Sequence, residues 1–234
     1  MKNYEFWLDQ EHLDLMLKHE LLGLSDDEIK EAFYTELGFG TGGLRGLMGV
    51  GTNRINVYTI RRATLGFARF LKSKPHKGGV AISYDNRKDS KFFAKQAAMV
   101  LAAEGIKSYL FNELRPTPML SFAVRHFACA GGIMITASHN PKAYNGYKAY
   151  DHTGAQLNLA DADQVISEIS KIDTLFDIPV LDSKLIEYID QRFDQIYLKK
   201  LKEVMIHDEK KVVKIVYSPL HGAGGPIIPR LLKD

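Results

Sequence analysis

The segment 131–141, GGIMITASHNP, decides the fold of this 234-residue chain and indicates its chemistry. Residues 133–136 are apolar or β-branched and are bounded by glycines on one side and polar residues on the other, which is typical of a short buried strand. The strand leads into a loop in which the hydroxyl of Ser138 is followed by the imidazole of His139. Because α/β sheets usually bind ligands at the carboxyl ends of their strands, the segment predicts a core strand that presents a serine to a ligand.

The segments around this strand alternate between strand and helix patterns. The expected strands cover residues 79–84, 107–111, 133–136 and 146–150, and the expected helices cover residues 56–71, 89–103, 116–127 and 158–171. This alternation predicts an α/β fold in which a β-sheet is sandwiched between α-helices. The strand from Gly146 follows its predecessor too closely for a crossover connection, so we expect it to run antiparallel and the sheet to be mixed.

We expect three parts along the chain. Residues 1–39 form an N-terminal helical extension with two short helices, the second of which begins at a capping box made by Ser25 and Glu28. Residues 40–182 form the α/β domain. Residues 183–234 contain a long helix from Ser183 to about 204, an apolar strand over 212–217 and a final helix, and resemble the truncated start of a second, similar domain.

Composition excludes several classes of protein. The chain has 31 basic and 28 acidic residues and a formal charge of +3, which does not favour a nucleic-acid-binding protein. No stretch reaches the roughly 18–20 apolar residues that a membrane-spanning helix needs. Its single cysteine cannot form an intrachain disulfide, and the N-terminus has no apolar signal core. We expect a cytoplasmic protein without a membrane or nucleic-acid partner.

Cations follow the serine closely in the sequence. Asn145-Gly146 is a typical tight-turn pair, and the alternation beyond it places Lys148 on the same face as Tyr150. A hydroxyl with an imidazole and an ammonium nearby suits a phosphoryl group, whose negative charge needs positive partners. A serine-triad hydrolase is a poor alternative, because adjacent side chains such as Ser138 and His139 are expected to diverge. The simplest alternative is a strand-terminating turn whose polar side chains bond to their own backbone.

The glycine-rich stretch GFGTGG, residues 38–43, formally matches a dinucleotide-binding fingerprint. A predicted helix precedes it and no helix follows it directly, whereas the fingerprint requires a strand before it and a helix after it. An oxidoreductase that binds a dinucleotide is therefore disfavoured.

Several motifs together resemble the α-D-phosphohexomutase superfamily. TASHNP at residues 136–141, followed by NGYK at 145–148, is similar to the active-site signature of these enzymes. FGTGGLRG at residues 39–46 resembles their N-terminal arginine loop, and SYDNR at 83–87 and RPTP at 115–118 occur in the family order. The resemblance covers roughly residues 38–234 and is greatest to the phosphoglucomutase branch that also holds phosphopentomutases.

The resemblance implies a mutase that interconverts hexose 1-phosphate and 6-phosphate through a phosphoserine and a sugar bisphosphate. Ser138 would carry the phosphoryl group, Arg45 would neutralise it, and His139 and Lys148 would handle the hydroxyl proton or orient the phosphate. It also implies Mg²⁺ bound through the phosphate on Ser138 and glucose 1,6-bisphosphate as activator. Arg87 is expected to brace the loop through a local ion pair instead of touching substrate.

The sequence departs from the family pattern at the metal site. The Asp-x-Asp-x-Asp loop that supplies the family's magnesium ligands does not occur, so we expect an N-terminal fragment that is nearly inactive alone. Phosphomannomutase and phosphopentomutase activities remain open. A non-catalytic module that binds a phosphosugar or a protein is the alternative of a different class. The missing C-terminal domains, or a second copy of the chain, would then cover the incomplete second domain.

Overall fold

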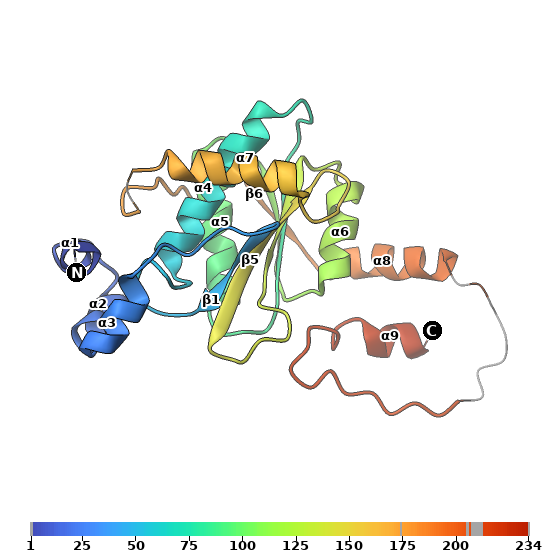
Figure 1. Ribbon diagram of the computed structural model, residues 1–234. Coiled ribbons are helices and arrows are strands. Elements are labelled where there is room, and N and C mark those ends of the chain that lie inside the picture. The colour runs from blue at the N-terminus through green and yellow to red at the C-terminus, as the bar shows by residue number, and fades with distance from the viewer. Residues whose placement is uncertain (1, 174, 205, 207–212, 234) are drawn as a thin grey trace.

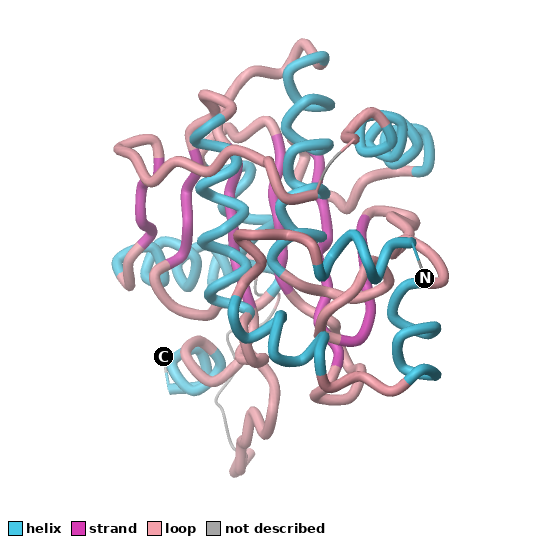
Figure 2. Tube along the Cα trace, turned by 90° about the vertical axis from the view of Figure 1, so that its left-hand side faces the viewer, coloured by secondary structure: helices cyan, strands magenta, loops and turns pink. Residues whose placement is uncertain are grey.

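A six-stranded mixed sheet forms the centre of the protein (Figures 1 and 2). The structure is a computed structural model and describes residues 2–173, 175–204, 206 and 213–233. The strand order is β1-β5-β4-β2-β3-β6. The strands are β1 Gly43–Leu47, β2 Val80–Tyr84, β3 Ser108–Phe111, β4 Gly131–Ile135, β5 Tyr144–Asp151 and β6 Ile186–Ile189. β5 runs antiparallel to both of its neighbours, whereas β4, β2, β3 and β6 are parallel, which confirms the predicted mixed sheet.

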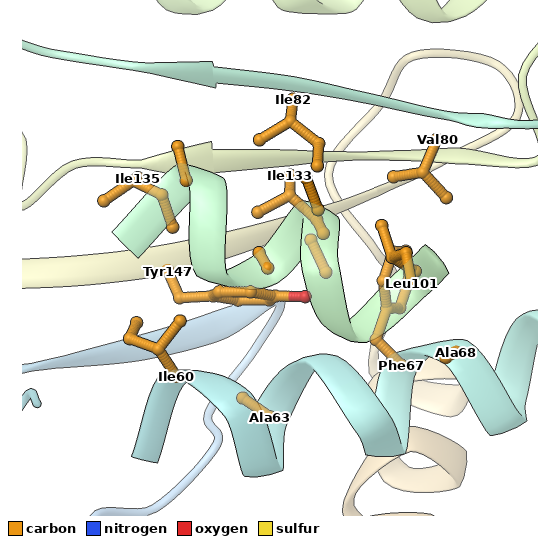
Figure 3. Packing of buried hydrophobic residues seen from close by; sticks show 14 of the residues in the cluster. Ile60, Ala63, Phe67, Ala68, Val80, Ile82, Leu101, Ile133, Ile135 and Tyr147 are labelled. Atoms are coloured by element: carbon orange, nitrogen blue, oxygen red, sulfur yellow. The ribbon is translucent and has the colours of Figure 1, made fainter. Parts of the chain in front are cut away.

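Helices cover both faces of this sheet (Figure 1). One face carries α4 Val57–Ser73, α5 Ser90–Ala103 and α7 Leu159–Ser170, and the other carries α6 Thr117–His126 and α8 Arg192–Glu203. Figure 3 shows how Tyr147 of β5 lies between the strands and Ile60 and Phe67 of α4. The buried aromatic and aliphatic side chains on both faces supply the apolar area that stabilises the layers.

The N-terminal helices form a separate small cluster. They are α1 Lys2–Leu8, α2 Leu15–Leu22 and α3 Asp26–Phe33, and the capping box of Ser25 and Glu28 at the start of α3 is confirmed. Trp7 is 1% exposed and makes edge contacts with Phe33, Tyr58 and Phe176. Since Tyr58 lies in α4, these aromatic contacts attach the extension to the α/β layers.

Two strands were not expected from the sequence. β1 begins at Gly43, the last residue of the glycine-rich stretch, and β6 occupies the start of the predicted helix from Ser183. β6 forms because its backbone pairs with β3 over residues 186–189 while Ile186 and Ile189 are buried. The predicted long helix is therefore wrong at its start, and α8 begins only at Arg192. The division into 1–39, 40–182 and 183–234 stays a prediction.

The predicted strand over 212–217 does not form within the described residues 213–217; Val212 lies outside them. Among the residues that the structure describes, no neighbouring strand pairs with this stretch, and Val216 is fully exposed. The expected last helix is present as α9, Ile228–Lys233, and both views place it beyond one end of the strands (Figures 1 and 2). Within the described part of the chain, no helix is long and apolar enough to cross a bilayer.

Candidate active site

The serine loop, residues 136–143, joins the end of β4 to the start of β5. Ser138 has a φ of +56°, in the left-handed region, and its side chain is exposed. Its backbone N–H donates to the hydroxyl of Thr136 over 3.0 Å. A non-glycine residue in this conformation costs about 1–2 kcal/mol, so the surrounding contacts must hold it there.

This backbone conformation brings Ser138 and His139 together. The Oγ atom of Ser138 lies 3.3 Å from Nδ1 of His139. The expectation that these adjacent side chains diverge is therefore wrong, because the positive φ of the serine turns its hydroxyl toward the next residue. Within the described residues, no carboxylate binds the imidazole of His139, so the third member of a serine triad is absent from these contacts.

Arg45 reaches the same loop from a distant part of the sequence. It lies on β1 opposite Gly146 of β5, and its Nη1 donates to Oδ1 of Asn140 over 2.9 Å. The side chain of Asn140 therefore binds a cation of β1 instead of closing a local turn. The guanidinium is exposed at the serine loop, where it can attract an anion.

Lys148 lies within β5, away from the serine loop. It pairs with Met134 in β4, and its side chain is on the face of Tyr150, opposite Tyr147 and Ala149, as predicted. It is half-buried, and among the described residues it makes no hydrogen bond or ion pair. The structure thus brings His139 to the hydroxyl of Ser138 and Arg45 to Asn140 of the same loop, but it gives Lys148 no direct contact with the loop's side chains.

Arg87 holds the backbone of the serine loop. Its Nε lies 3.2 Å from Oδ2 of Asp85, which confirms the predicted ion pair. Its two terminal nitrogens donate to four carbonyl oxygens, those of Ser138 (2.9 Å), Asn140 (2.7 Å), Pro141 (2.9 Å) and Tyr144 (3.1 Å). The guanidinium is thus a brace beneath the loop, since its donors are used on the backbone.

Asp85 connects that brace to the strands. Its carboxylate accepts hydrogen bonds from the hydroxyls of Thr136 (2.7 Å) and Ser90 (2.8 Å) and from the backbone N–H of Arg87 (3.0 Å). Thr136 in turn accepts from the backbone N–H of Ser138, so one buried carboxylate orders the start of the serine loop. Asp85 was expected only as an ion-pair partner, and its contact with Thr136 depends on the pairing of β2 with β4.

Asn145 and Gly146 lie inside β5, and the predicted tight turn at these residues is wrong. A Cβ atom at Gly146 would lie 2.7 Å from the carbonyl oxygens of both Leu44 and Thr136. The glycine is needed because backbones approach it from both sides. Asn145 is fully buried and donates to Ser90 and to the carbonyl of Lys88.

The model for domain I of the phosphoglucomutase and phosphomannomutase family, described as an alpha/beta/alpha domain, matches residues 36–176. The chain belongs to this family. It is 41% identical to a phosphoglucomutase of Staphylococcus haemolyticus over 209 residues, covering 87% of this chain and 38% of that protein. It is 40% identical to a phosphoglucomutase of Staphylococcus aureus strain MRSA252, covering 98% of this chain and 42% of that protein.

Solved structures of the family share the fold. A phosphomannomutase-like protein from Thermus thermophilus is 31% identical, with a TM-score of 0.63 over 72% of this chain and 36% of that chain. A family protein from Burkholderia thailandensis has a TM-score of 0.64 at 21% identity, covering 83% of this chain and 41% of that chain. The chain thus spans about two fifths of the length of the curated relatives that it matches.

The residues around Ser138 do not form a complete site for Mg²⁺, on which phosphoglucomutases generally depend. Mg²⁺ prefers several oxygen ligands in octahedral geometry. The described residues contain no group of three or more His, Cys, Asp or Glu side chains that could hold a metal ion. The carboxylate of Asp85 lies near the loop, but its oxygens already bind Thr136, Ser90 and Arg87. Only the oxygen on Ser138 remains as a candidate ligand among the described residues of the loop.

Proposed function

We propose that this chain carries the phosphoserine site of a phosphoglucomutase-type isomerase, which moves a phosphoryl group between the 1- and 6-positions of a hexose. The observation that carries the proposal is the serine loop, in which an exposed hydroxyl in a left-handed conformation lies beside His139 while Arg45 binds Asn140 of the same loop. A buried ion pair fixes the loop from below, and phosphoryl transfer depends mainly on such positioning and on charge stabilisation.

In the proposed reaction, the phosphoryl group moves from Oγ of Ser138 to a sugar hydroxyl. The bond between phosphorus and Oγ breaks as the bond to the sugar oxygen forms, and the sugar hydroxyl loses its proton. The resulting bisphosphate turns around in the site and returns its other phosphoryl group to Oγ. Arg45 offsets the charge of the transferring group, and His139 or Lys148 accepts the proton or orients the phosphate. No step is assigned to a metal, because the described residues do not complete its site.

Within this class, the sugar can be glucose, mannose or a pentose. The relatives named phosphoglucomutase favour glucose 1-phosphate, whereas the phosphomannomutase-like neighbour makes mannose the second candidate. Glucose 1,6-bisphosphate is the expected activator, because it can phosphorylate the serine directly. A cytoplasmic location, where sugar phosphates are used, is part of this proposal.

Mass spectrometry of the serine peptide tests the proposal on the chain itself. We expect prolonged incubation with glucose 1,6-bisphosphate and MgCl₂ to phosphorylate Ser138 slowly and only in part, because the chain is expected to be nearly inactive alone, and to label none of the neighbouring hydroxyls. The Ser138→Ala variant is the control and should take no label. Binding of the bisphosphate without any labelling would contradict the mutase proposal and favour the non-catalytic binding module. Parallel experiments with mannose 1,6-bisphosphate and ribose 1,5-bisphosphate rank the three sugars by the rate at which each bisphosphate phosphorylates Ser138.

A further inference from the structure

A buried carboxylate outside the serine loop is shared by two arginines. Asp194 lies in the first turn of α8 and is 1% exposed. Its Oδ1 accepts from Nε of Arg115 over 2.7 Å, and its Oδ2 accepts from Nη2 of Arg115 and from Nη1 of Arg230, each over 2.9 Å. Charge-assisted, two-pronged contacts of this kind are the strong ones, so this cluster fixes the parts of the chain that meet in it.

The two arginines come from different parts of the fold. Arg115 is 3% exposed and follows β3, and its backbone is tied to the end of β2 by bonds with Tyr84 (3.2 Å) and with the hydroxyl of Ser83 (2.9 Å). Arg230 lies in α9, and its side chain is 36% exposed. Asp194 thus joins the last described helix to the carboxyl edge of the sheet.

The serine loop lies at the same edge. β2 is flanked by β4, which ends at the serine loop, and by β3, which leads to Arg115. Asp85 directly follows Tyr84, and its carboxylate accepts from Thr136, which accepts from Ser138. Hydrogen bonds and covalent bonds therefore connect Ser138 through Thr136 and Asp85 to the end of β2, and from there through Arg115 to Asp194. Asp194 then binds Arg230 of α9.

We propose that Asp194 is a positioning residue that holds the C-terminal segment, residues 213–233, over the carboxyl edge of the sheet, with Arg230 as the contact that can be released. Asp194 keeps its partner Arg115 when Arg230 is removed, so the core contact survives while α9 loses its charged anchor. The apolar contacts of Ile227 and Leu231 with the cluster around α6 and α8 then remain as its attachment. The effect of this anchor on sugar-phosphate binding rests on the proposed function.

Hydrogen–deuterium exchange on three variants tests the anchor. Arg230→Gln removes the charged contact, and Arg230→Lys keeps a cation that can replace the single bond from Nη1. Arg192→Gln is the matched control, because it removes an exposed arginine from the same helix that carries Asp194. We expect Arg230→Gln to speed exchange in residues 218–233 by about tenfold and to leave strands β2 and β4 unchanged. Arg230→Lys should restore much of the protection.

Labelling kinetics at Ser138 then test the positioning role. We expect Arg230→Gln to raise the half-saturating concentration of glucose 1,6-bisphosphate about threefold or more, with the maximal labelling rate nearly unchanged, because the proposed anchor would act on binding and not on the transfer step. Exchange in Arg230→Gln that matches Arg192→Gln would overturn the proposal. Faster exchange with unaltered half-saturation would overturn it as well. A wild-type chain that takes no label contradicts the proposed function instead, and the exchange comparison alone then decides whether the anchor exists.

Discussion

The serine loop and the stretch 213–217 differ in a way that their sequences do not suggest. The loop is polar and largely exposed, yet Arg87 binds its backbone at several points and Asp85 accepts from the hydroxyl of Thr136. The stretch 213–217 is apolar, yet Ile215 is 60% and Val216 fully exposed, and no strand pairs with it among the described residues. The comparison teaches that a segment is ordered by the partners that its backbone finds, whatever its own hydropathy.

The largest effect on this comparison is expected from Arg87→Met. The change removes the donors of three loop carbonyls and of the carbonyl of Tyr144, and it leaves the carboxylate of Asp85 without its cation. Removing one partner of a buried ion pair costs about 3 kcal/mol or more, and we expect a loss of that size in the free energy of unfolding. Urea denaturation measures it.

An exposed lysine of the same loop provides the control for Arg87→Met. Lys142→Met should change the free energy of unfolding by less than about 0.5 kcal/mol, because the side chain is exposed. Equal losses in the two variants would show that the brace contributes nothing beyond an ordinary surface cation.

A smaller loss is expected from Gly146→Ala. The added Cβ would lie 2.7 Å from the carbonyl oxygens of Leu44 in β1 and of Thr136 directly after β4, so β5 must shift away from one of them. Overpacking of this kind costs about 2 kcal/mol. Thermal unfolding checks it against Gly38→Ala, where a Cβ meets nothing within 4 Å. A Gly146→Ala protein as stable as Gly38→Ala would contradict the close approach.

Substitutions at Ser138 should separate stability from chemistry. Ser138→Gly relieves the left-handed conformation, whereas Ser138→Ala keeps its cost, so we expect the glycine variant to be more stable by about 1 kcal/mol. Neither variant should accept a phosphoryl group. Urea denaturation of the pair measures the strain directly, and an alanine variant that is the more stable of the two would show that the loop does not store it.

The smallest effect is expected in the C-terminal segment. Val216→Ser replaces a fully exposed side chain and should change the free energy of unfolding by less than about 0.5 kcal/mol. Ile133→Ala, at a fully buried position of β4, is the matched comparison and should cost about 3 kcal/mol. A large loss from Val216→Ser would mean that the stretch is packed, and the contrast between the two regions would disappear.

The sequence predicted the elements whose signals are local. The buried strand before Ser138 and the capping box at Ser25 depend on neighbouring residues. The capping box is found as expected, and the strand, expected over residues 133–136, forms over Gly131–Ile135. The face of Lys148 was also predictable, because side chains alternate along a strand wherever it begins. These features need no knowledge of which strands pair.

The features that were missed depend on pairing between distant segments. Asn145-Gly146 favours a turn by its own chemistry, but the approach of β1 and β4 places it inside a strand. The bond between Arg45 and Asn140 depends on the register of β1 against β5, which no local pattern determines. The short apolar pattern at residues 186–189 fits a helix or a strand equally well. It forms the strand β6 because the edge of β3 offers its backbone a partner, which the sequence pattern does not reveal.

β6 has a practical consequence for anyone who shortens the chain. A piece that ends at residue 182 would leave β3 as an open edge, with the backbone groups that now pair with residues 186–189 available to other molecules. Such unprotected edges promote aggregation. A piece extended through α8 keeps the edge capped and retains the buried Ile186 and Ile189. Expression trials of the α/β layers should therefore stop no earlier than residue 203.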